Sequence, residues 1–201
     1  MPVLPQKFRK HHILLPIGWI YGIVTGIRNF MFNCGWKKET AFSVPVINVG
    51  NIAVGGTGKT PHTEYLIGLL KDRYRIAVLS RGYKRRTKGF VLAQAGCSAE
   101  TIGDEPFQIY CKYPDIIVAV CENRVKGINA LMDCANPDIV LLDDAFQHRY
   151  VKPRVNIMLT DFNRFILFDS LLPAGRLRES KKGIGRADIV VVTKCPENVD
   201  T

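Results

Sequence analysis

The sequence predicts a three-layer α/β fold with a mainly parallel sheet. Short apolar runs rich in β-branched residues alternate with helix-like segments, which is typical of parallel strands joined by crossover helices. The chain has 201 residues, of which 47% are hydrophobic, so it can bury one substantial core. No internal repeat or low-complexity tract interrupts the alternation. We therefore expect one main domain over residues 41–201, preceded by an N-terminal segment over residues 1–40.

The candidate strands are apolar runs too short to be independent helices. They cover Ser43–Val49, Ile76–Leu79, Ile116–Val120, Ile139–Leu142, Val155–Leu159 and Ile189–Val192. Helices are expected over Thr60–Lys71, Glu105–Lys112 and Asn123–Cys134. The last strand ends shortly before Thr201, where an α/β nucleotide-binding domain would normally continue. We therefore expect either a fragment or a chain without a lobe that comparable enzymes carry.

Charge and cysteine content narrow the classes of partner. The formal net charge of +10 favours acidic partners such as nucleic acid, anionic lipid or phosphorylated substrates, and does not choose among them. The six cysteines are far apart, with no C-x-x-C pair. The sequence therefore signals neither a zinc knuckle nor a redox motif.

The N-terminal segment combines basic residues, from Lys7 to His12, with an apolar run over Ile13–Val24. No small-residue cleavage site follows this run, and it is shorter than the roughly 20 residues that span a bilayer. Trp19 and Phe30, beside Arg28, suit a helix at the lipid interface. The alternative is a helix packed on the protein's own core.

A glycine-rich loop lies between the first predicted strand and the first crossover helix. It consists of Ala53, Val54, Gly55, Gly56, Thr57, Gly58, Lys59 and Thr60. Such a loop turns backbone N–H groups toward phosphates, and the helix N-terminus adds partial positive charge. Lys59 is expected to reach the β- and γ-phosphates and Thr60 to bind Mg²⁺. Ala53 replaces the first glycine of the P-loop pattern. Alanine adopts most turn conformations with negative φ, so we expect the loop to accommodate this replacement. A P-loop NTPase fold follows.

Acidic residues occupy two positions that can complete the site. Asp143 and Asp144 directly follow an apolar strand, so one of them is expected to hold Mg²⁺ at the carboxyl edge of the sheet. The alternative is a solvated pair of carboxylates. Asp104 and Glu105 open a predicted helix, where they can serve as caps, or Asp104 can accept the proton of an attacking hydroxyl.

Basic residues follow the second and the fifth predicted strands. Arg81 begins a cluster that is either a solvated face or a cradle for an anionic substrate. Arg176 lies in a turn that leads to an expected helix, where an arginine can stabilise a transferring phosphoryl group.

Together these motifs resemble one family, the tetraacyldisaccharide 4'-kinases of lipid A biosynthesis. The resemblance covers nearly the whole chain from about residue 12 and keeps the family's motif order. Its motifs are Val49-Gly50-Asn51 with Gly55-Gly56-Thr57-Gly58-Lys59-Thr60-Pro61, Ser80-Arg81-Gly82-Tyr83, Gly103-Asp104-Glu105-Pro106, Asp143-Asp144-Ala145-Phe146-Gln147-His148 and Leu172-Pro173-Ala174-Gly175-Arg176-Leu177-Arg178-Glu179. The family has glycine where Ala145 stands.

The resemblance implies a kinase that moves the γ-phosphate of ATP to the 4'-hydroxyl of a tetraacylated disaccharide 1-phosphate. It implies that Lys59 and Thr60 bind ATP and Mg²⁺, with Asp143, Asp144 and Glu105 at the metal. It further implies Asp104 as the base and Arg176 as the neutraliser of phosphate charge. The implied substrate-binding residues are Arg81, Gln147 and His148.

The resemblance also implies a peripheral or monotopic enzyme on the cytoplasmic face of the inner membrane, with no nucleic-acid partner. It implies a C-terminal lobe, with a histidine that partners the catalytic aspartate, outside this sequence. One alternative is a P-loop NTPase or GTPase acting on a protein partner. Val192–Glu197 is a weak match to the guanine-reading Asn-Lys-x-Asp motif, although Thr193 and Pro196 differ from it. The other alternative is a nucleotide-binding remnant without activity.

Overall fold

The computed structural model describes residues 12–197, which divide into two compact units. Within the described chain, unit 1 holds residues 12–38, 50–58 and 157–197, and unit 2 holds residues 39–49 and 59–156. The chain passes from unit 1 to unit 2 inside the glycine-rich loop, between Gly58 and Lys59. The predicted division into residues 1–40 and 41–201 stays a prediction, and Lys7, Arg9, Lys10 and His11 lie outside the described residues.

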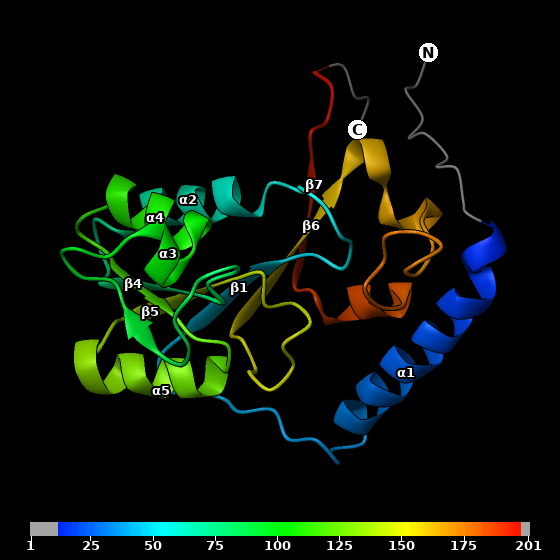
Figure 1. Cartoon of the computed structure of the whole chain (residues 1–201), viewed down its shortest axis with the longest axis horizontal. Coiled ribbons are helices and arrows are strands. Elements are labelled where there is room, and N and C mark those ends of the chain that lie inside the picture. Colours follow the sequence, from blue (N-terminus) through cyan, green and yellow to red (C-terminus); the bar gives the residue numbers. More distant parts are fainter. Residues whose placement is uncertain (1–11, 198–201) are drawn as a thin grey trace. The chain divides into compact units, whose positions relative to one another are not determined.

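Unit 2 is built on a sheet whose strands run in the order β3-β4-β2-β5-β1 (Figure 1). These strands are β1 (Val46–Gly50), β2 (Ile76–Ser80), β3 (Val91–Leu92), β4 (Ile117–Val120) and β5 (Ile139–Asp143). All neighbours are parallel except β3 and β4, which are antiparallel. The central strands are buried on both faces, which explains why they are continuous β-branched runs rather than alternating ones. The predicted mainly parallel sheet is confirmed.

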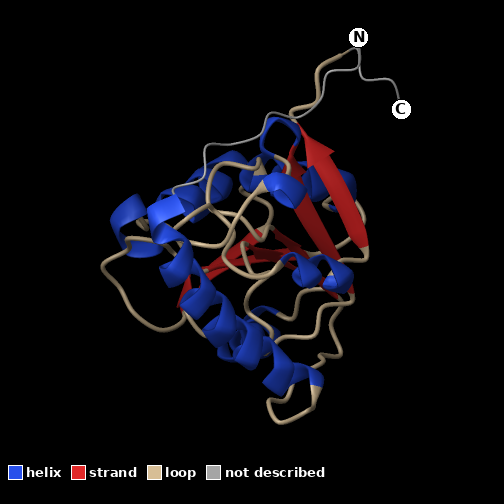
Figure 2. Ribbon diagram, turned by 90° about the vertical axis from the view of Figure 1, so that its right-hand side faces the viewer, coloured by secondary structure: helices blue, strands red, loops and turns tan. Residues whose placement is uncertain are grey.

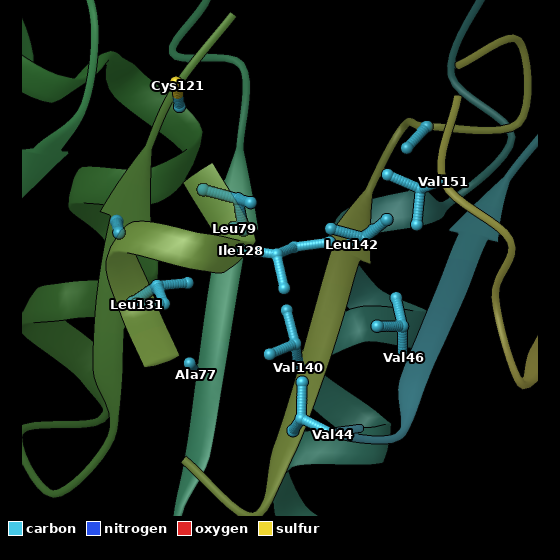
Figure 3. Close-up of a cluster of buried hydrophobic side chains, with 12 residues drawn as sticks. Val44, Val46, Ala77, Leu79, Cys121, Ile128, Leu131, Val140, Leu142 and Val151 are labelled. Carbon is cyan, nitrogen blue, oxygen red and sulfur yellow. The ribbon is translucent and has the colours of Figure 1, made fainter. Parts of the chain in front are cut away.

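Helices cover both faces of this sheet, as a three-layer fold requires. They are α2 (Lys59–Leu70), α3 (Ala99–Ile102), α4 (Asp104–Lys112) and α5 (Arg124–Ala135). On one face, Ile128 and Leu131 of α5 pack against strand residues such as Leu79 and Val140 (Figure 3). On the other face, a second cluster joins Ile67 of α2 and Ile109 of α4 to Ile76, Val78, Val118 and Leu141. Figure 1 shows α5 on one side of the strands and α2, α3 and α4 on the other.

Unit 1 contains one long helix, a pair of strands and several single turns. The helix α1 (Leu15–Asn33) follows the 3₁₀ turn η1 (His12–Leu14), and the parallel strands are β6 (Val155–Asp161) and β7 (Ile189–Thr193), drawn in red in Figure 2. The remaining 3₁₀ turns are η2 (Phe162–Arg164), η3 (Ile166–Phe168) and η4 (Lys181–Arg186). The helix expected after Arg176 is thus the 3₁₀ helix η4.

Helix α1 packs mainly with its small and polar side, and Phe32 near its C-terminal end is a large apolar residue that is also buried. Gly18 and Gly22 lie against the chain near Leu171, and the Tyr21 hydroxyl donates a hydrogen bond to the carbonyl of Arg178 at 2.8 Å. About two turns further on, the Asn29 amide donates to the Glu179 carboxylate at 3.0 Å. Gly22 permits a close approach, because a Cβ there would lie 2.7 Å from a terminal methyl of Leu171, whereas a Cβ on Gly18 would make ordinary contacts.

The opposite side of α1 presents large apolar side chains to solvent. Ile17, Ile20, Val24 and Ile27 follow each other at helical spacing and are all more than half exposed. Trp19, Ile23 and Phe30 widen the same surface. Within the described chain, no helix is both long enough and apolar enough to span a bilayer.

Candidate active site

The glycine-rich loop leaves β1 at Gly50 and reaches α2 at Lys59. Gly55 and Gly58 have φ values of +128° and +83°, in the region that only glycine adopts without strain. Ala53 is not among the described residues with positive φ, so an alanine fits there, as expected. It is buried and forms an antiparallel bridge with Leu177. The substitution of the first glycine is therefore compatible with the loop.

Two hydrogen bonds fix the ends of this loop within unit 1. The Asn51 amide donates to the Thr57 hydroxyl at 2.7 Å, and both side chains are buried. The Val54 N–H donates to the carbonyl of Arg176 at 2.8 Å. Arg176 is thereby held beside the loop. The structure therefore brings Arg176 to the predicted phosphate site.

A cavity of about 380 Å³ opens over the loop in unit 1. Its lining comes from the loop, from the carboxyl ends of β6 and β7 and from the segment before η4. The charged groups are Asp161, Arg164, Asp169, Arg176 and Lys194, and the loop contributes Ala53, Val54, Gly55, Gly56 and Thr57. Three cations and five loop residues around one hollow suit a polyphosphate.

In unit 2, the first residues of α2 face the carboxylates that follow β5. Lys59 and Thr60 occupy the first two positions of α2. The Lys59 ammonium lies 3.7 Å from Asp144 Oδ1, and the Lys59 side chain is only 14% exposed. Asp144 has a φ of +50°, and its N–H donates to the carbonyl of Val49. Left-handed backbone at an aspartate is uncommon, and such conformations concentrate at functional sites.

Asp143 is the most perturbed acid of this half of the site. Its side chain is almost fully buried, and this burial raises the pKa of Asp143 to about 7, with the charges of Glu105 and Asp144 acting in the same direction. The cations of Lys59 and Arg124 oppose the rise. Asp143 Oδ1 is buried and accepts no hydrogen bond from the described residues. A buried carboxylate oxygen without a donor is suited to a metal ligand.

The residues present fit Mg²⁺ only if a ligand supplies further oxygens. Among residues 12–197, no three His, Cys, Asp or Glu side chains converge closely enough to hold a metal by themselves. Mg²⁺ usually binds through one or two carboxylates together with substrate phosphates and water. Asp143, Asp144 and the Thr60 hydroxyl are compatible with that mode. Glu105 is exposed, and its negative charge helps to raise the pKa of Asp143.

The predicted base, Asp104, is the first residue of α4 and is exposed. Gly103 precedes it with a φ of +93°. A Cβ on Gly103 would lie 3.0 Å from the carbonyl oxygen of Tyr83 and 3.1 Å from the Cα of Gly82. The loop after β2 therefore determines where α4 begins, and with it the position of Asp104.

Gln147 and His148 follow the aspartate pair and are partly buried. His148 lies on a second cavity, of about 480 Å³, lined by Thr40, Glu122, Asn123, Val125, His148 and Tyr150. Its Nε2 accepts a hydrogen bond from the N–H of Arg124 at 3.4 Å. Gln147 is not among the residues that line this cavity. The expectation that Gln147 and His148 both contact the substrate stays a prediction.

Arg81 is exposed, and its charge acts on the pKa of Arg124. Two other arginines of the basic cluster form ion pairs within unit 2. Arg85 forms an ion pair with Glu122 at 2.6 Å, and Arg86 forms one with Glu100 at 3.0 Å. The cluster is therefore partly a structural brace of the loop after β2 and only partly a candidate cradle.

Arg124 is a site residue that the sequence analysis does not identify. It is 3% exposed, and its guanidinium donates to the carbonyls of Cys121 at 2.6 Å and Asp143 at 3.4 Å. It thus joins the ends of β4 and β5, and burial lowers the pKa of Arg124 to about 10. Arg124 lies within the helix predicted over Asn123–Cys134, where no local pattern marks it as a site residue. Two further charged residues lie at strand ends: Asp161 is the last residue of β6, and Lys194 directly follows β7.

The comparisons with known proteins agree with this geometry. The model of the family LpxK, tetraacyldisaccharide-1-P 4'-kinase, matches residues 10–201. Tetraacyldisaccharide 4'-kinases of Bacteroides thetaiotaomicron and Flavobacterium psychrophilum are 56% and 55% identical to this chain, over 98% and 92% of its length. The alignments cover 52% and 54% of those relatives, so the chain spans about half the length of the curated relatives that it matches.

A solved structure points to the same family. It is an LpxK from Aquifex aeolicus in complex with ATP, with a TM-score of 0.85 and 42% identity, and the match covers 90% of this chain and 58% of that one. The predicted P-loop NTPase fold is thereby confirmed. Because the family model matches residues 10–201 and these relatives are more than 50% identical over nearly all of this chain, the chain belongs to the tetraacyldisaccharide-1-P 4'-kinase family.

Proposed function

We propose that the chain binds ATP and is the nucleotide-binding part of a kinase that phosphorylates the 4'-hydroxyl of a tetraacyldisaccharide 1-phosphate. The observation that carries this proposal is the Lys59 ammonium at 3.7 Å from Asp144, where the glycine-rich loop enters α2. A lysine between a phosphate loop and a carboxylate that follows a strand is the arrangement that phosphoryl transfer uses. The family membership supports the choice of lipid substrate.

In this proposal, the residues divide the reaction among them. Asp104 accepts the proton of the 4'-hydroxyl as its oxygen forms a bond to the γ-phosphorus, and the bond from that phosphorus to the β–γ bridging oxygen breaks, so that ADP leaves. Lys59 and Arg176 neutralise charge on the phosphates. Thr60, Asp143 and Asp144, with Glu105 nearby, would hold Mg²⁺, which supplies charge neutralisation when bound. Arg81, Gln147 and His148 would contact the sugar phosphate.

The experiment that tests nucleotide binding is calorimetry with Mg·ATP on the chain as it stands. We expect saturable heat from the wild type and at least about tenfold weaker binding for Lys59→Ala, because the charge-assisted bonds to phosphate are lost. Lys71→Ala is the matched control, since Lys71 follows α2 at its other end, where it forms an ion pair with Asp72 at 3.7 Å. Equal heats for wild type and Lys59→Ala would contradict the proposal.

The remaining alternatives are separated by two further measurements. A clear preference for GTP over ATP would favour the NTPase that acts on a protein partner. Transfer of labelled γ-phosphate to the disaccharide, compared with Asp104→Ala, separates a kinase from an inactive remnant. No product above that of Asp104→Ala would favour the remnant, even if ATP binds.

We further propose that α1 attaches the protein to the cytoplasmic face of the inner membrane as a peripheral or monotopic enzyme. The support is the side of α1 that carries Ile17, Ile20, Ile23 and Val24, each more than half exposed. Apolar side chains on one side of a helix, with a net charge of +10 on the chain, suit anionic lipid. The same surface would bring the enzyme to a lipid substrate, and we expect no nucleic-acid partner.

Sedimentation with anionic vesicles tests this attachment. We expect the wild type to pellet with vesicles of phosphatidylglycerol and phosphatidylethanolamine, and Ile20→Ser/Ile23→Ser to pellet several-fold less. The melting temperature of this double variant should equal that of wild type, because both isoleucine side chains are already exposed. Leu69→Ser, an exposed apolar position on α2, is the control and should pellet like the wild type. Equal pelleting of all three proteins would exclude α1 as the membrane contact.

A further inference from the structure

The segment that follows β7 contacts the phosphate loop within unit 1. The Thr193 hydroxyl donates a hydrogen bond to the carbonyl of Thr57 at 3.1 Å, and the Lys194 ammonium donates to the carbonyl of Gly56 at 2.6 Å. Two successive loop carbonyls thus have donors from adjacent residues of one strand end. Thr193 is buried, so its bond is shielded from water.

Holding a loop carbonyl also directs an N–H group. In a trans peptide, the carbonyl of one residue and the N–H of the next point in opposite directions. The bond from Lys194 to Gly56 therefore fixes the peptide plane between Gly56 and Thr57, whose N–H donates to the carbonyl of Gly55 at 3.1 Å. The bond from Thr193 to Thr57 fixes the next peptide plane, between Thr57 and Gly58. Both planes belong to the part of the loop that would surround phosphate.

Lys194 is itself held in place by its surroundings. Its ammonium also donates to Asp161 Oδ2 at 2.9 Å, and the Asp161 side chain is 10% exposed. Lys194 has a φ of +57°, which is uncommon for a residue with a Cβ and costs energy. The Lys194 side chain is 52% exposed, and its two acceptors, the Gly56 carbonyl and the Asp161 carboxylate, hold its ammonium at the loop.

We infer that Lys194, together with Thr193, is a positioning residue for triphosphate binding. The two side chains hold the Gly56 and Thr57 carbonyls and so keep the loop in the conformation that would bind phosphate. Lys194 also lines the cavity over the loop, so its charge attracts the same anion. This inference rests on the proposed function and adds to it a contribution from the end of β7.

The inference also accounts for the weak match of Val192–Glu197 to a guanine-reading motif. The lysine of that pattern is present and contacts the phosphate loop, whereas Pro196 offers no carboxylate to accept hydrogen bonds from guanine. The segment therefore supports the phosphate loop through Lys194 but lacks the carboxylate that would select guanine. Selection of GTP is not expected from it.

Lys194→Met tests the inference, because methionine keeps an unbranched side chain and removes the donor. We expect binding of both Mg·ATP and magnesium tripolyphosphate to weaken about tenfold, which corresponds to about 1.4 kcal/mol. Thr193→Val, which removes only the hydroxyl, should weaken both about threefold. The control Lys182→Met changes an exposed lysine of η4 and should leave both affinities unchanged.

Two further measurements separate positioning from general destabilisation. One is the affinity of Lys194→Arg, and the other is the set of amide resonances of Gly56, Thr57 and Gly58. The arginine variant keeps a donor and should bind within about threefold of wild type, while Lys194→Met shifts the loop amides and leaves distant amides in place. If wild type binds both ligands and Lys194→Met binds them equally well, the inference is overturned and the proposed function stands. If wild type binds neither ligand, the proposed function fails, and the inference fails with it.

Discussion

At the scale of single residues, the site keeps a carboxylate where water cannot solvate it. Asp143 is 2% exposed, and burial together with Glu105 and Asp144 raises its pKa to about 7. As the pH rises, the carboxyl of Asp143 loses its proton near pH 3.8 in the unfolded chain, whereas the folded protein keeps this proton until about pH 7. The free energy of unfolding must then fall as the pH rises from about 4 to about 7, since ionisation is opposed only in the folded state.

Asp143→Asn should remove this pH dependence. In EDTA, we expect the variant to melt at a higher temperature than wild type at pH 8, by a smaller margin at pH 5, and at a similar temperature below about pH 4. The full difference in pKa corresponds to an upper limit of about 4 kcal/mol at pH 8. Thermal melting across this pH range measures it.

The control for this prediction is Asp133→Asn, an exposed carboxylate on α5. Its melting curve against pH should run parallel to that of wild type. Parallel curves for wild type and Asp143→Asn would show that folding does not raise the pKa of Asp143.

Single residues also show what the sequence can predict of the site. Lys59, Asp143 and Asp144 are recognisable because each directly follows a strand or a glycine-rich loop, where local pattern fixes the position. Arg124 and Lys194 escape this reasoning, because their roles depend on carbonyls far away in the chain. No local pattern identifies the acceptors of a buried guanidinium or of a lysine in left-handed conformation.

At the scale of elements, the start of α4 depends on the loop after β2. Gly103, at a φ of +93°, leaves no room for a side chain beside the backbone of Gly82 and Tyr83. The N–H of Arg86 and the hydroxyl of Thr87 extend this contact by bonding the carbonyls of Glu100 and Thr101, at 2.7 and 2.6 Å. The two loops therefore form one support for Asp104.

Gly103→Ala should destabilise unit 2 by roughly 1 to 3 kcal/mol, because both the backbone conformation and the contact with backbone atoms oppose a Cβ. Urea unfolding measures the effect. Gly68→Ala, on α2 with open space around the added Cβ, should instead stabilise by about 0.5 to 1 kcal/mol. A Gly103→Ala midpoint at or above that of wild type would refute the proposed support.

The elements also differ in how visible they are in the sequence. The strands of unit 2 are predicted to within a few residues, because parallel strands buried on both faces are continuous apolar runs. β3 has two residues and α3 has four, too few to give a periodic pattern. α1 continues to Asn33, beyond the apolar run that ends at Val24, because Thr25 and Asn29 belong to the side that packs on the protein.

At the scale of the whole molecule, the fold class and family follow from the sequence, but the division into units does not. The described chain passes between its units at residues 38–39, 49–50, 58–59 and 156–157. A linear sequence gives no sign of the third passage, because it falls inside the phosphate loop, where no linker composition marks it. The sheet and its helices were predictable from period and burial, whereas contacts between distant segments were not.

The arrangement of α1 has a consequence for how substitutions will be tolerated. At its outward positions, a polar replacement is expected to leave folding intact and to weaken the proposed contact with lipid. At Gly22, a larger side chain would meet the terminal methyl of Leu171, so the packed side changes while the outer surface does not. Replacements that improve the behaviour of the purified protein and replacements that preserve the proposed membrane contact therefore act in opposite directions on the same nineteen residues.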